Sequence, residues 1–477
     1  MNISKRPADV EKIIILSIIF IFPLLILLCF TIDLKFATGD PETAGMIFSS
    51  VGVGGLSSIF AIVISLSLMA VQFASQQYTH RIMDIHINSL IFKSVIAIYL
   101  VSIAYNVFMI GWLELDKSVD YRYVEISMLL AALSLFMLFP YFYFTMRRLR
   151  PESVISKLLA KIDEDYLNSI KRYFKEGEPR IPGKADKMLP ITEIIEKSLS
   201  SGDRETVRFG IGEVYECYMS HLKEENEDYV SPYFMKHLLD IGRETINRAN
   251  DASMVQLLEI FGCVGKHAIL ENMSVSARMS VECIDTIGFK VLEDYDVATQ
   301  QMIDSLQGML REIINSGNEE VLGQIFTLYH NTSDELFTLE KDQMLKYMAN
   351  SFSELPDLMM RNRCYDIIER TAGLLECIGI FAVNLDLRDV LHQSVHSLYK
   401  MGISSAKDNL VWETPNRTLI VAERIIDHLL KIEEETLKCK SKLKEFDSII
   451  NEIEYAMKDI EKYRKEEEEA DFSDLWH

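Results

Sequence analysis

Apolar residues form four long runs within the first 150 positions of the chain. The runs cover residues 13–32, 44–77, 90–113 and 124–146. Each run holds the roughly 20 apolar residues that a helix needs to cross a hydrocarbon core about 30 Å thick. The pattern therefore predicts a four-helix transmembrane module over residues 1–150.

The pattern from Pro151 onward is that of amphipathic helices. Apolar residues recur at steps of three and four, and the breaks between these segments carry Gly, Asn, Asp or Ser. We expect an all-α protein whose residues 151–415 form a cytoplasmic helical domain. Helices of about 15–20 residues with short links favour a HEAT-like solenoid of stacked pairs. The glycines at the breaks show no fixed period, so a globular helical bundle is the alternative.

Residues 416–477 predict one long amphipathic helix with an acidic tail. Its apolar positions alternate in steps of three and four, which is typical of a coiled-coil seam between subunits. The seam consists of Leu429, Ile432, Leu443, Phe446, Ile450, Ile453, Met457 and Ile460. In the alternative arrangement, this helix packs back on its own domain.

Lysine and arginine residues near the ends of the apolar runs indicate the orientation. Eight lie before the first run, between the second and third runs, or directly after the fourth run, which are all on the same side of the membrane. Three lie in the two loops on the other side. Because cytoplasmic loops are enriched in positive charge, we expect both termini in the cytoplasm and the module in the cell (inner) membrane, in contact with lipid.

The net charge is concentrated after the membrane module. Residues 1–150 carry 11 Lys and Arg against 10 Asp and Glu, so the remaining residues carry 38 basic and 61 acidic side chains and a net charge of −23. Such an acidic domain repels nucleic acid, and it raises the local concentration of inorganic cations.

One face of the second apolar run is small or polar. Its members, which fall on one helical stripe, are the candidate pore-lining residues Gly54, Ser58, Ser65, Met69, Gln72 and Gln76. Small residues at such spacing let membrane helices pack closely. Alternatively, the stripe lines a water-filled path, with Leu68 or Met69 as a hydrophobic constriction.

The end of this run carries a recognisable segment. Gln72, Ala74-Ser75 and Gln77-Tyr78-Thr79, followed by Arg81, resemble the signature of the DUF2254 family of bacterial and archaeal predicted membrane proteins, with His80 in place of the usual proline. The similarity covers about residues 1–165. It implies a four-helix membrane module and supplies no established reaction or site residues.

The loop that follows the second run contains groups that could respond to a signal. His80, Arg81 and His86 crowd its cytoplasmic end, and histidine titrates near neutral pH. We consider them candidate gating residues, and a polar interfacial turn is the alternative.

Catalytic and metal-binding patterns are absent from the sequence. It has no phosphate-binding loop, no nucleophile elbow and no kinase signature, so we expect neither an enzyme nor a cofactor. His392 and His396 share a helical face without an evident third ligand, and we therefore expect no metal site.

The architecture favours an oligomeric channel or pore of four or more chains. Its path would be lined by the second transmembrane helix and regulated by the helical domain. The alternative is a membrane-anchored scaffold or sensor that recruits a cytoplasmic protein partner. A third, weaker hypothesis is a membrane-disrupting effector.

Overall fold

The computed structural model describes residues 40–77, 90–116, 120–148, 150–175, 186–225, 228–407, 415–439 and 447–474. Every regular element within these segments is a helix, which confirms the all-α prediction. The chain divides into two compact units, the first ending at Lys161 and the second beginning at Ile162.

The first unit contains the membrane helices. Its elements are α2 (Pro41–Met46), η1 (Ile47–Gly55), α3 (Leu56–Gln77), α5 (Leu90–Asp116), α6 (Tyr121–Phe136), α7 (Leu138–Arg148) and α8 (Pro151–Leu159). Three stretches of the unit are long and apolar enough to cross a membrane, namely Pro41–Met69, Ile91–Glu114 and Tyr121–Arg147. They correspond to the second, third and fourth predicted runs, and the first run lies outside the described residues.

Two of these spans have an irregular backbone. The second contains nine residues of π-helix, Ile47–Gly55, between α2 and α3. The fourth is interrupted at Met137, between α6 and α7. Pro140 lies one turn further on and lacks the N–H that would bond back across this point, which accounts for the interruption.

The second unit is built from stacked helices. They are α9 (Glu164–Lys175), α10 (Leu189–Ser201), α11 (Arg204–Glu225), η2 (Asp228–Val230), α12 (Ser231–Asn247), α13 (Asp251–Leu270), α14 (Ser274–Val291), α15 (Asp296–Ser316), α16 (Leu322–Thr338), α17 (Asp342–Ser351), η3 (Phe352–Glu354), α18 (Pro356–Arg361), α19 (Tyr365–Asn384), α20 (Arg388–Lys407), α21 (Pro415–Cys439) and α22 (Asp447–Asp474).

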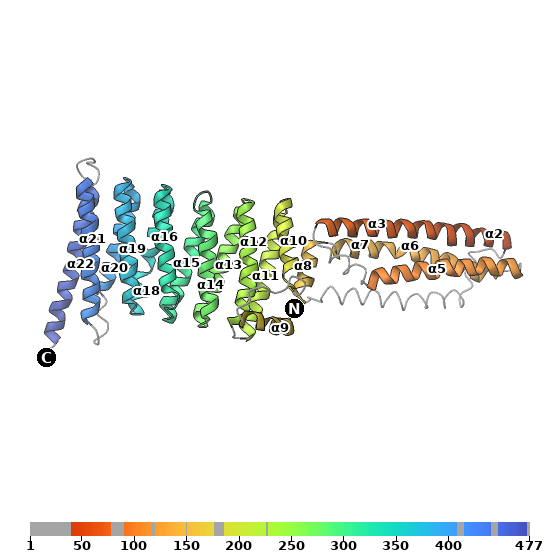
Figure 1. The fold of residues 1–477 in the computed structure, drawn as a ribbon, viewed down its shortest axis with the longest axis horizontal. Helices are drawn as coiled ribbons and strands as arrows, with labels where there is room; N and C mark the ends of the chain where they lie inside the picture. Colours follow the sequence, from red (N-terminus) through yellow and green to blue (C-terminus); the bar gives the residue numbers. More distant parts are fainter. Residues whose placement is uncertain are drawn as a thin grey trace. The chain divides into compact units, whose positions relative to one another are not determined.

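From α10 onward these helices stand in a row and form two layers (Figure 1). One layer contains α10, α12, α14, α16, α19 and α21, and the other contains α11, α13, α15, α17 with α18, α20 and α22. Each helix packs against its neighbour along the chain and its neighbour within the layer. This is the repeat arrangement expected of a solenoid.

The turns between helices recur with a regular spacing. Residues with positive φ follow one another 23 positions apart at Gly317, Glu340, Arg363 and Asp386. The residue after each of the last three donates its N–H to a carbonyl five positions back, as in Lys341 to Leu336 at 2.9 Å. This is the Schellman motif, which ends a helix and reverses the chain. Only one of these four positions is glycine, which explains why glycines revealed no period in the sequence.

The C-terminal region departs from the prediction of one long helix. It forms two helices, α21 and α22, which pack on each other and on α20 (Figure 1). The apolar stripe predicted as an oligomerisation seam is buried within the chain, with Leu429, Ile432, Ile453 and Ile460 all 0% exposed. Ile432 lies against Gly379 of α19, and Ile460 lies against Gly402 of α20, so the stripe packs within the chain's own fold. Leu443 and Phe446 lie outside the described residues.

The helix α13 is as apolar as a membrane span but has a different role. Its length and composition qualify it as a candidate span, yet 61% of its apolar window is buried inside the protein. It packs against α14 and α15 in the middle of the repeats. Burial among neighbouring helices accounts for its composition.

Candidate functional site

The inner face of the second membrane helix packs on the other helices of its unit. Leu56 and Val63 from α3 join a cluster with Val95 and Tyr99 from α5. Further along α3, the buried Ser67 hydroxyl accepts a hydrogen bond from Tyr141 of α7. This face is therefore a packing surface.

A buried polar cluster lies beside the π-helical segment. Asn106 of α5 donates to the Ser102 carbonyl at 2.7 Å and accepts a hydrogen bond from Ser127 of α6. Ser102 and Ser134 hydroxyls are 3.1 Å apart. A Cβ on Gly52 would lie 2.0 Å from the Asn106 Oδ1, so only glycine fits there. These polar groups bond to one another and hold the helices together, as is common within membranes.

The outer face of the second membrane helix carries the candidate pore-lining residues. Gly54, Ser58, Ser65 and Gln72 are exposed, and Met69 is 51% exposed. The Ser58 hydroxyl donates to the Gly54 carbonyl at 2.8 Å. The structure thus places these five residues on one uncovered face, and the side chain of Gln76 lies outside the described part of the chain.

The exposed faces of the other spans are chemically different. On α5 the exposed residues include Val101, Phe108 and Trp112, and on α6 and α7 they include Phe136 and Phe139. Large apolar side chains of this kind suit contact with lipid tails. Among the described membrane helices, the second span differs in exposing Gly54, Ser58, Ser65 and Gln72. Large apolar residues, among them Ile62 and Leu68, are exposed beside them.

The predicted gating residues cannot be placed. His80, Arg81 and His86 all lie outside the described residues. Their role remains a prediction from the sequence.

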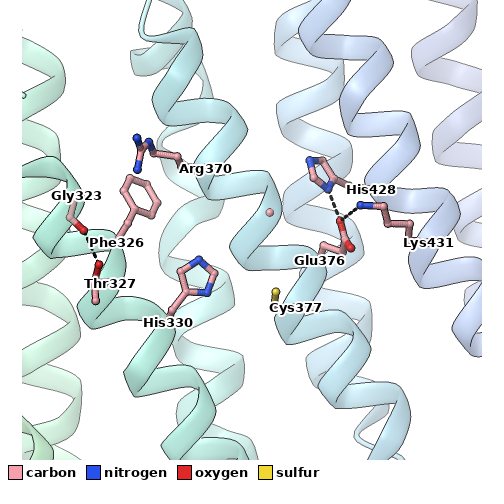
Figure 2. A pocket seen from close by; sticks show the side chains of 10 residues that line it. Gly323, Phe326, Thr327, His330, Arg370, Glu376, Cys377, His428 and Lys431 are labelled. Atoms are coloured by element: carbon pink, nitrogen blue, oxygen red, sulfur yellow. Dashed lines mark hydrogen bonds and ion pairs between the residues drawn. The ribbon is translucent and has the colours of Figure 1, made fainter.

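A second candidate site lies in the repeat unit, in a cavity of about 480 Å³ between α16, α19 and α21. The cavity is lined by Gly323, Phe326, Thr327, His330, Arg370, Gly373, Glu376, Cys377, His428 and Lys431. Figure 2 shows His428 and Lys431 reaching Glu376 from α21, while Arg370 and His330 lie nearer α16. Basic and titratable groups from three helices therefore converge on one cavity.

The carboxylate of Glu376 is the centre of this arrangement. Its Oε2 atom accepts hydrogen bonds from both the His428 ring and the Lys431 ammonium, the latter at 3.1 Å. The side chains of Glu376 and His428 are only 14% and 16% exposed. Burial, followed by the neighbouring Glu376 and Asp334 carboxylates, raises the pKa of the Cys377 thiol above its usual value. Cys377 is therefore a poor nucleophile.

An acidic cavity of about 410 Å³ adjoins the first and shares Gly323 and Thr327 with it. Its lining includes Glu282, Asp285 and Glu320. The two cavities lie on opposite sides of α16 and differ in charge, which makes the first one a local basic region in an acidic domain.

Comparison with known proteins identifies the membrane part of the chain. Residues 12–201 match the family of predicted membrane proteins DUF2254. The match confirms the resemblance expected from the sequence, and it extends past the DUF2254 membrane unit to the end of α10. The chain is therefore a membrane protein with transmembrane helices, and its residues 12–201 are similar to a family of unknown function.

Other comparisons add little to this assignment. No curated protein matches the chain. One solved structure is a "circular tandem repeat protein with novel repeat topology and enhanced subunit contact surfaces", which is 10% identical to this chain. The alignment covers 91% of this chain and 99% of that protein's chain, with a TM-score of 0.25. A similarity of this strength carries no argument about function.

The basic cavity, which lies beyond the DUF2254 match, was missed by sequence reasoning. Arg370, Glu376, His428 and Lys431 come from two helices some 50 residues apart in the chain, without a local motif. The 23-residue spacing of the turns could have shown which helices lie side by side in the repeats. Three of the four turn positions are not glycine, so this spacing is not visible in the sequence.

The paired histidines of α20 contact each other and a neighbouring carboxylate. The rings of His392 and His396 are stacked with centroids 6.3 Å apart, and His392 contacts Glu452 at 3.3 Å. Within the described segments, no three His, Cys, Asp or Glu side chains are grouped as metal ligands would be.

Proposed function

We propose that the protein is an oligomeric membrane channel whose path is lined by the second transmembrane helix. The observation that carries this proposal is the exposed face of Gly54, Ser58, Ser65 and Gln72, on a unit whose other exposed faces are large and apolar. The Ser58 hydroxyl is paired within its own helix, through the Gly54 carbonyl, so the small side chains and the exposed Gln72 amide distinguish this face. Small residues allow close helix contact, and an amide is costly in hydrocarbon unless it is paired or faces water. This face is therefore best covered by other subunits, or turned toward an aqueous axis.

Between the described helices of one membrane unit, the interior offers no route for ions. Asn106, Ser127 and Ser67 are bonded to neighbouring helices, and the rest of the inner face is packed with apolar side chains. A conducting path would therefore lie between subunits, with Met69 as its narrow apolar point.

The charge of the chain favours cations as the permeant species. If both termini face the cytoplasm, as the Lys and Arg counts predict, the acidic repeat unit is cytoplasmic. Its negative charge would then concentrate inorganic cations on the cytoplasmic side of the cell membrane. Movement of this unit would regulate the path through the helices that join it.

Thiol accessibility tests the path directly. In a cysteine-free background, Ser58→Cys, Ser65→Cys and Gln72→Cys should react with a membrane-impermeant thiol reagent. The matched control is Val101→Cys on α5, which is 56% exposed and lies on a face of large apolar side chains. Protection of all four positions, or a subunit count of one or two in lipid nanodiscs, would contradict the channel.

The repeat unit supports a second candidate function, a membrane-anchored scaffold or sensor. Its two cavities of opposite charge beside α16 provide a surface for a cytoplasmic ligand or protein partner. Solenoids commonly bind through such extended surfaces. A monomeric protein with protected α3 cysteines would favour this function over the channel.

A further inference from the structure

We propose that the cavity between α16, α19 and α21 binds a small oxyanion, a phosphate or carboxylate group carried by a compact solute. The site does not depend on whether the membrane unit conducts. Its lining contains Arg370, Lys431 and two histidines but only one carboxylate, in a chain with a net charge of −22. Figure 2 shows His428 and Lys431 at this carboxylate, and Arg370 and His330 on the side of α16.

The first argument is the unpaired positive charge. Glu376 is already engaged by His428 and Lys431 through the same oxygen atom. Neither the Arg370 guanidinium nor the His330 ring has a hydrogen-bond or ion-pair partner among the described residues. A guanidinium presents a planar set of donors that matches the two oxygens of a carboxylate or phosphate. Arg370 therefore offers a docking group that the fold itself does not use.

The second argument is the space left open by two helical glycines. A Cβ on Gly323 or Gly373 would meet no atom within 4 Å, so neither glycine is required by packing. Glycine within a helix destabilises it relative to alanine. Both glycines line the cavity from facing helices and leave room for a bound solute.

The third argument concerns size and surroundings. The volume of about 480 Å³ is typical of a small-molecule site. The adjoining cavity carries Glu282, Asp285 and Glu320, which would repel an extended acidic polymer. A compact anion fits the basic cavity without entering the acidic one. Since burial keeps the Cys377 thiol protonated, the site is suited to binding and not to covalent chemistry.

Binding can be measured by isothermal titration calorimetry on the full chain in nanodiscs of zwitterionic lipid. The probes are inorganic phosphate and succinate, and the tighter of the two identifies the chemical group. We expect Arg370→Ala and Lys431→Gln each to weaken binding about tenfold, the effect of losing one charge-assisted hydrogen bond. Arg370 is exposed and unpaired, so its replacement should leave the fold intact.

A matched control lies on the same helix as Lys431. Lys438 is also exposed and paired with a glutamate, Glu435 at 2.5 Å, but it lies outside the cavity. Lys438→Gln should leave binding unchanged. Glu376→Gln should tighten binding several-fold because it removes the only negative charge from the lining, a result that a purely structural role would not produce.

A space-filling variant separates binding from folding. Gly373→Met should abolish binding while the circular dichroism spectrum and melting temperature are kept, because its side chain enters open space. The proposal is overturned if neither probe binds at concentrations up to about 10 mM, because a weaker dissociation constant would not indicate specific binding. It is also overturned if Arg370→Ala and Lys431→Gln bind like the unmodified protein, or if Lys438→Gln weakens binding equally.

Discussion

The contact between Gly402 and Ile460 permits a quantitative test of how the C-terminal helices are held. Gly402 lies on α20, and a Cβ added there would approach the Ile460 Cδ1 of α22 to 2.3 Å and its Cγ1 to 2.8 Å. Real Cβ atoms do not come this close, so the buried Ile460 side chain or one of the helices must shift. Gly402→Ala should therefore destabilise the α20–α22 contact by about 1–3 kcal/mol, the usual cost of overpacking a core.

A double-mutant cycle isolates this contact. Ile460 is 0% exposed, so Ile460→Ala alone should cost about 2–5 kcal/mol. In the double variant, the alanine at position 460 removes the atoms that clash with the new Cβ. The combined loss should be smaller than the sum of the single losses by about 1–3 kcal/mol, as expected of residues in contact.

Hydrogen exchange followed by mass spectrometry is the suitable assay, because a long repeat array does not unfold in one step. Protection in α22 should fall in both single variants, and protection in α13 should not change. Gly373→Ala is the control, since its Cβ meets no atom and alanine should stabilise the helix by up to about 1 kcal/mol. Additive losses, or a change of subunit number without loss of protection, would show that Ile460 serves an intermolecular seam instead.

Two further predictions concern buried polar groups. Asp186 accepts a hydrogen bond from Tyr233 at 2.9 Å and pairs with His237 at 3.1 Å. Burial raises the pKa of this carboxyl. The bonds from His237 and Tyr233 outweigh burial and hold the pKa below its ordinary value of 3.8. A depressed folded-state pKa stabilises the fold fully above the unfolded value, and this stabilisation is lost as pH falls through the folded one. Hydrogen exchange in α10 and α12 should therefore accelerate below about pH 4, and Asp186→Asn should accelerate it already at neutral pH. If the Asp186→Asn protein keeps full protection at pH 7, the pair is not stabilising. In the membrane unit, Gly52→Ala should lower the melting temperature measured in nanodiscs, because its Cβ collides with Asn106, and Asn106→Ala should restore part of the loss. No rescue by the second change would place the strain elsewhere.

Several features of the fold could be predicted because they depend on local patterns. Runs of about 20 apolar residues predict membrane spans, since only a helix satisfies its own backbone in lipid. Three of the four appear as described helices of sufficient length. Helical periodicity likewise predicted an all-α second unit, which the structure confirms. The stripe of Gly54, Ser58 and Ser65 stays a prediction as a pore lining.

Other features required the tertiary structure. The apolar stripe around Ile453 has the same periodicity whether it meets a second chain or its own domain, and periodicity cannot name the partner. α13 resembles a membrane span in composition, and only its burial among other helices distinguishes it. The proline at position 140 is a sequence signal for the interruption of the fourth span at Met137. The π-helix in the second span, Ile47–Gly55, contains no proline that would indicate it.

The sequence by itself determined the membrane spans, the helical class and the acidic charge of the second unit, because each follows from residues near one another along the chain. The tertiary structure alone decided which faces are covered. It left the small polar face of α3 open, buried the C-terminal stripe, and brought Arg370, Glu376 and Lys431 to one cavity. The physical reason is that burial and charge proximity depend on which helices stack together, and this stacking is set by many weak contacts between distant residues.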